Sequence, residues 1–144
     1  MNLGELGASL LLGISALGSG IGILIVGQAT IGAWKKCYLQ KKSAPMLLLA
    51  FTGNPITQTL YGYILMGYAR DAAAANPGNS LTYLGLFTSA SIALAGTAIV
   101  QGKIGACAVD TLVETGKGFA QYMIVMGIAE TIALFAMVFT MTSL

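Results

Sequence analysis

The length of the stretches without a charged side chain constrains the fold of this sequence more than any other feature. Residues 6–33, 45–68 and 81–102 carry no charge, and residues 118–144 carry a single one. A membrane-spanning helix needs about 20 mostly apolar residues, so each stretch is long enough to span a bilayer. Barrel strands need only about ten residues of alternating polarity, and runs of this length therefore predict four helices.

The composition supports the same class of protein. Only 8% of the 144 residues are charged and 56% are hydrophobic, whereas about a quarter of the residues in soluble domains are charged. This balance excludes a soluble enzyme, a disordered chain and a disulfide-stapled secreted domain. It also excludes a nucleic-acid-binding protein, because the chain lacks a basic stripe. The sequence predicts an all-α membrane protein with four transmembrane helices.

The distribution of basic residues predicts the orientation in the membrane. We expect three short connections, at residues 34–44, 71–80 and 110–117. Six lysines lie in or beside the first and third connections, namely Lys35, Lys36, Lys41, Lys42, Lys103 and Lys117. Only Arg70 lies near the second, so both termini are expected on the extracytoplasmic side. A signal peptide is the alternative for the N-terminus, but no basic segment precedes the apolar run, which is too long.

The two halves of the chain resemble each other. Residues 28–33 align with residues 101–106, and residues 55–62 align with residues 129–136 after a one-residue change of offset. The first and third helices are both rich in small residues, which let helix backbones approach closely in lipid. We therefore expect two duplicated helical hairpins in parallel orientation, residues 1–72 and residues 73–144. The small residues predict either the inner wall of a ring or tight dimer packing.

Glu130 is the charged residue expected near the middle of the fourth helix. A charged side chain at the bilayer centre costs about 2.5–3.5 kcal/mol on insertion scales, and such residues usually carry function. The alternative is a permanently protonated side chain that only links helices. The second helix offers a polar face at the same depth, because Asn54, Thr57, Gln58 and Tyr61 follow helical spacing.

The residue types around Glu130 predict a site for a monovalent cation. Pro55 lacks a backbone N–H, so a carbonyl oxygen near it is expected to be unpaired. Together with Gln101, the polar face supplies hard oxygen ligands around one negative charge, which favours Na⁺ over a divalent ion. H⁺ is the alternative, although a proton carrier needs fewer partners. Tyr61 is expected to donate a hydrogen bond to Glu130. Gln101 lies beyond the middle of the expected third helix, so it reaches the depth of Glu130 only if that helix extends past the membrane or sits lower in it.

These features resemble the proteolipid c (or K) subunit of V-type rotary ATPases, and bacterial Na⁺-translocating members in particular. The resemblance covers essentially the whole chain and includes residues 54–62, Gln101 and residues 127–131. It implies an ion site made by Glu130, Gln101, Thr57, Gln58, the backbone carbonyl of Asn54, and Tyr61 bonded to the glutamate. Asn54 departs from the apolar residue usual in the family. Ile56 stands where a single-hairpin ancestor would have its carboxylate, so the first hairpin is expected to be ion-silent.

The resemblance also implies the partners and the setting. Copies of the chain would close into a rotor ring in a bacterial plasma membrane. The ring would contact a central-stalk subunit and a stator subunit, and the stator subunit would supply an arginine. ATP would be turned over on other subunits, because this chain has no P-loop and no catalytic site of its own. The alternative function is a small proton-coupled secondary transporter of the multidrug type. Such carriers tend to place the carboxylate in the first span, where this chain has only Glu5 at the membrane edge.

Overall fold

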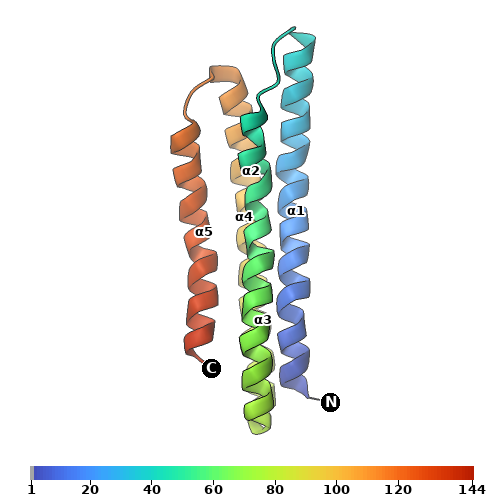
Figure 1. The fold of residues 1–144 in the computed structure, drawn as a ribbon, viewed down its shortest axis with the longest axis vertical. Coiled ribbons are helices and arrows are strands. Elements are labelled where there is room, and N and C mark those ends of the chain that lie inside the picture. The colour runs from blue at the N-terminus through green and yellow to red at the C-terminus, as the bar shows by residue number, and fades with distance from the viewer. Residues whose placement is uncertain (1) are drawn as a thin grey trace.

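Every regular element in residues 2–144, the part of the chain that the computed structural model describes, is helical (Figure 1). Two long helices, α1 and α4, lie side by side; the shorter α3 packs against both of them, and α5 packs against α4 and α3. In this part of the chain, three 3₁₀ turns interrupt or join the helices. The bounds are α1 (Leu3–Leu39), η1 (Met46–Leu48), α2 (Leu49–Gly53), η2 (Asn54–Ile56), α3 (Thr57–Ala75), η3 (Pro77–Asn79), α4 (Ser80–Thr115) and α5 (Phe119–Thr142).

The helices alternate in direction, so both termini lie at the same end of the bundle (Figure 1). The helices α1 and α4 run parallel, because successive glycines of α1 face successive residues of α4. A Cβ atom built on Gly7 would lie 3.0 Å from the Cα of Leu84, and one built on Gly18 would overlap Ala95. This order agrees with two hairpins that each return the chain to the same side.

Within residues 2–144, three helical segments are long and apolar enough to cross a membrane: Leu3–Leu39, Pro77–Thr115 and Phe119–Thr142. The remaining expected span is divided among α2, η2 and α3, although these elements continue in one column beside α1 (Figure 1). Pro55 lies in η2 and cannot donate a backbone hydrogen bond, which breaks the helix. The four-span arrangement therefore stays a prediction.

The helices extend further than the charges in the sequence suggested. The helix α1 continues to Leu39, α3 to Ala75 and α4 to Thr115, so the predicted connections were too long. Lysine and glutamate are good helix formers and lengthen a helix beyond the lipid. Lys103 was expected beside the third connection, but it lies well inside α4. With 36 residues, α4 is about 54 Å long against about 30 Å of hydrocarbon, so it extends past the membrane.

Small residues bring α1 and α4 into direct backbone contact. A Cβ atom on Gly102 would overlap the backbone of Gly22, and one on Gly22 would overlap the carbonyl of Ala98. The tight packing expected of the two small-residue helices therefore occurs within one chain. Other glycines of α1 face away from it, because Gly13 and Gly20 have no neighbouring atom within 4 Å of a built Cβ.

Two apolar clusters divide the core along the bundle axis. One lies towards the chain termini and includes Leu11, Leu65 and Phe87. The other lies towards the opposite end and includes Phe51 and Met126. Polar side chains occupy the layer between the clusters, where the apolar packing above and below keeps the local dielectric low.

Candidate ion-binding site

Glu130 lies near the middle of α5, as the sequence predicts, and its side chain is half-buried. Ala129 and Ala133 on the same helix are buried against the bundle, whereas Ile128 and Ile132 are exposed. The carboxylate therefore lies at the edge of the buried face of α5. From this position it can contact α3 and α4, and it remains close to the outer surface of the chain.

Two side chains from different helices donate hydrogen bonds to the carboxylate. The hydroxyl of Tyr61 on α3 lies 2.6 Å from Oε1 of Glu130. The side-chain nitrogen of Gln101 on α4 donates to Oε2, and it also lies 3.4 Å from the carbonyl oxygen of Met126. Both carboxylate oxygens thus have a partner. The contact between Tyr61 and Glu130 is the one expected from the sequence.

The hydrogen bonds continue into the broken helix. Nε2 of Gln58 donates to Oε1 of Gln101 at 2.8 Å. The hydroxyl of Thr57 lies 3.2 Å from Oε1 of Gln58 and 3.0 Å from the carbonyl oxygen of Asn54, so the two acceptors share its one proton. All six residues predicted for the site are therefore joined in one hydrogen-bonded chain, which runs from Asn54 through Glu130 to Tyr61.

The turn at η2 determines the position of Thr57 and of the Asn54 carbonyl. The sequence predicts an unpaired carbonyl near Pro55, but the carbonyl of Asn54 accepts both the N–H and the hydroxyl of Thr57. A 3₁₀ turn bonds residues three apart, and this pairs the carbonyl that we expected to be free. Gly22 leaves room for the turn, because a Cβ atom there would lie 2.8 Å from Cβ of Pro55.

The two glutamines of this site are buried, so their amide groups need hydrogen-bond partners. Gln58 and Gln101 have no exposed surface, and in residues 2–144 each buried side-chain nitrogen or oxygen atom has a hydrogen-bond partner. Leaving a buried polar group without a partner costs about 1–3 kcal/mol. Gln101 lies about one turn beyond the middle of α4. Because α4 extends past the membrane, this position is at the depth of Glu130, and the two side chains are hydrogen-bonded.

The site presents one carboxylate together with amide, hydroxyl and carbonyl oxygens. These are hard ligands of the kind that Na⁺, Ca²⁺ and Mg²⁺ prefer, and a single carboxylate suits a single positive charge. An amide exchanges its nitrogen and oxygen by a half-turn about its last bond. Such a turn at Gln101 would place Oε1 opposite the Glu130 carboxylate, and two facing oxygens attract a cation between them.

Two contributions were not predicted from the sequence. The Met126 carbonyl accepts a hydrogen bond from Gln101. Met126 lies one turn before Glu130 on α5, and this spacing is the feature of the sequence that indicates the contact. The closeness of Gly22 to Pro55 depends on how α1 packs against η2, and nothing in the local sequence indicates it.

Comparison with known proteins points to one family. No curated protein matches the sequence. Residues 84–142 match the family model of the ATP synthase C subunit. This stretch comprises all of α5 and most of α4, and it includes Gln101 and Glu130 but not the polar face of α3. The similarity to the C subunit of ATP synthase therefore applies to residues 84–142.

Proposed function

We propose that this chain is the proteolipid c (or K) subunit of the membrane sector of a V-type rotary ATPase and that it carries Na⁺ across the membrane. The observation that supports this most directly is the hydrogen-bonded chain that joins three helices at Glu130. The proposed Na⁺ ligands are oxygens of Glu130, Gln101, Thr57, Gln58 and the Asn54 backbone, with Tyr61 holding the carboxylate.

The extent of the polar network supports Na⁺ as the cargo rather than H⁺. A proton carrier needs the carboxylate and one hydrogen-bond partner, and Tyr61 alone would supply that partner. Two fully buried glutamines and a threonine exceed this requirement. Their amides can turn oxygen atoms towards a cation, which gives a use to polar groups that are otherwise costly to bury.

The proposed mechanism is electrostatic. Na⁺ neutralises Glu130, so the occupied site can pass lipid without a net charge. At the stator, an arginine from a separate polypeptide competes for the carboxylate and releases the ion. Each monovalent charge moved is worth about 2.3 kcal/mol per 100 mV, so several ions can be coupled to each ATP turned over elsewhere in the assembly.

The proposal includes an assembly of many copies in a ring with a stator subunit and a central-stalk subunit. It also includes a bacterial plasma membrane, extracytoplasmic termini and four spans in two duplicated hairpins. The single carboxylate on α5 supports one ion site per chain, with an ion-silent first hairpin. A small proton-coupled transporter is not favoured, because the groups that bond to the carboxylate are the Gln101 amide and the Tyr61 hydroxyl, and the network continues through the amide of Gln58.

Carbodiimide labelling of Glu130 tests the proposal. The reagent modifies protonated carboxyl groups, so a bound cation protects the site. We expect Na⁺, but not K⁺, to slow labelling in the assembled protein, and we expect the protection to weaken as the pH falls. Labelling that does not respond to Na⁺ at any pH would identify protons as the cargo and would overturn the Na⁺ assignment.

A substitution in the network sharpens the test. Gln58→Leu keeps the size of the side chain but removes the amide that contacts Gln101. We expect the Na⁺ concentration for half-protection to rise roughly tenfold, in line with the loss of one buried polar contact. Gln121→Leu changes an exposed glutamine of α5 and is the matched control. Equal protection in both variants would show that Gln58 is not a ligand.

A further inference from the structure

A groove on the surface of α1 lies outside the ion site, near the end of the bundle opposite the chain termini. Its volume is 360 Å³, and its lining combines apolar and aromatic side chains with one lysine. The lining residues are Ile31, Trp34, Lys35, Tyr38 and Leu39. The groove begins where the apolar part of α1 ends and the lysines begin, which is the level of a membrane–water boundary.

The aromatic wall of this groove is held in place. Nε1 of Trp34 donates a hydrogen bond of 2.9 Å to the carbonyl oxygen of Pro45, so the indole ring has a fixed orientation. Tyr38 is 67% exposed and Leu39 is 77% exposed. Exposed apolar and aromatic side chains beside lysines are typical of surfaces that contact lipid headgroups.

The charges around the groove lack acidic partners. In the part of the chain that the structure describes, the one ion pair joins Lys36 to Glu114, with 2.6 Å between Nζ and Oε1. Lys35 lines the groove itself, and the backbone N–H of Lys41 bonds to the carbonyl of Tyr38 at 3.1 Å. Lys35 and Lys41, the second of which lies two residues after Leu39 of the lining, therefore carry two positive charges without an ion-pair partner in residues 2–144.

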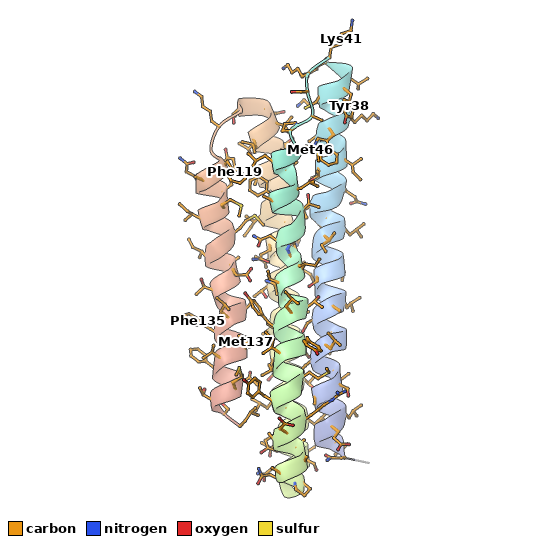
Figure 2. All side chains as sticks on the ribbon, in the orientation of Figure 1. Tyr38, Lys41, Met46, Phe119, Phe135 and Met137 are labelled. Carbon is orange, nitrogen blue, oxygen red and sulfur yellow. The ribbon has the colours of Figure 1, made fainter. Side chains whose placement is uncertain are left out.

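The backbone at the end of α1 adopts a left-handed conformation at Lys41. Lys41 has a φ of 55°, in the left-handed region, and Lys42 N–H closes the turn on the carbonyl of Cys37 at 2.9 Å. This position of a helix end favours glycine, because a side chain is strained there. Figure 2 shows Lys41 at the tip of the bundle, beyond Tyr38.

We propose that this groove binds an anionic phospholipid. Lys35 and Lys41 contact its phosphate, and the first carbons of an acyl chain lie along Ile31 and Leu39 against the Trp34 ring. A lipid fits better than a soluble acidic partner, because the groove is apolar below and positive only at its rim. The site is independent of the ion site, so either proposal can fail alone.

Trp34 provides the test, because it is the one tryptophan of the sequence. The full chain, as it assembles in phosphatidylcholine vesicles, is titrated with phosphatidylglycerol brominated near the head of the acyl chain, or with phosphatidylcholine brominated in the same way. Bromine quenches tryptophan fluorescence on contact. We expect an apparent affinity roughly tenfold higher for the anionic lipid, since each lysine near the surface adds to its attraction.

Two double variants with the same charge distinguish a site from a general surface potential. Lys35→Gln with Lys41→Gln should abolish the preference, whereas Lys42→Gln with Lys117→Gln should retain it. Equal losses in both would mean that only the net charge matters and would overturn the site. Quenching by neither lipid would mean that another copy of the chain covers the groove, which also overturns it. The helix content and the unfolding midpoint of each variant show independently of the ion site that the protein is folded.

Discussion

The hydroxyl of Tyr61 lies 2.6 Å from Oε1 of Glu130, although the two residues are 69 positions apart in the chain. They belong to α3 and α5, which meet beside α4. The bond fixes one oxygen of the carboxylate and leaves the other to Gln101. The orientation of the one acidic group in the polar layer thus depends on the packing of three separate helices.

Tyr61→Phe removes this hydrogen bond and leaves the ring in place. Hydrogen bonds to charged groups contribute about 1.5–3 kcal/mol, so we expect the Na⁺ concentration for half-protection of Glu130 to rise roughly tenfold or more. Carbodiimide labelling of the assembled protein measures this shift. Tyr63→Phe is the control, because Tyr63 lies on the same helix and is 60% exposed. A shift of the same size in both variants would contradict a specific role for Tyr61.

Two glycines of α1 should respond to alanine in opposite directions. Gly22→Ala forces a Cβ atom into the carbonyl of Ala98 and to 2.8 Å from Cβ of Pro55, and overpacking of this kind costs about 1–3 kcal/mol. Gly20→Ala meets no atom within 4 Å and should stabilise the helix by about 0.5–1 kcal/mol. Thermal unfolding in detergent measures both changes. A stable Gly22→Ala variant would contradict the close approach of α1 and α4.

The ion pair at the end of α1 predicts a dependence on pH. The hydrogen bond from Lys36 lowers the pKa of Glu114, and the same bond raises the pKa of Lys36 above its ordinary value of 10.5. The pair therefore stabilises the fold at neutral pH. Its contribution is lost in acid as Glu114 is protonated, and in strong base as Lys36 loses its proton.

Thermal unfolding of the wild type and Glu114→Gln across pH measures this contribution. We expect a small difference at pH 7, because both groups are exposed and salt screens them. The difference should disappear as the pH falls below the usual pKa of a glutamate. A difference that grows in acid would reverse the sign and contradict the pairing.

Lys41→Gly should stabilise the end of α1. Glycine adopts the left-handed conformation of Lys41 without strain, which is worth about 1 kcal/mol. Lys41→Ala removes the same charge but keeps the strained backbone, so it should bring no gain. Unfolding midpoints of the two variants compare the effects directly. Equal midpoints would show that the backbone at this position is not strained.

Much of the site could be predicted from the sequence because the polar residues are few. In an apolar chain, Glu130 and the spacing of Asn54, Thr57, Gln58 and Tyr61 stand out against their surroundings. The burial cost of such groups makes a shared layer the expected outcome. The ends of the helices were predicted less well, since charge marks the water boundary but does not end a helix.

The long charge-free runs and their order along the chain were enough to establish a helical membrane protein, because lipid leaves the backbone few other ways to satisfy its hydrogen bonds. Which groups meet was settled by packing instead. The depth of Gln101 follows from the length of α4, and the pairing of the Asn54 carbonyl follows from the 3₁₀ turn that Gly22 accommodates. The contacts of Gln101 with Glu130 and of Gly22 with Pro55 join residues distant in the chain, and local residue patterns do not indicate such contacts.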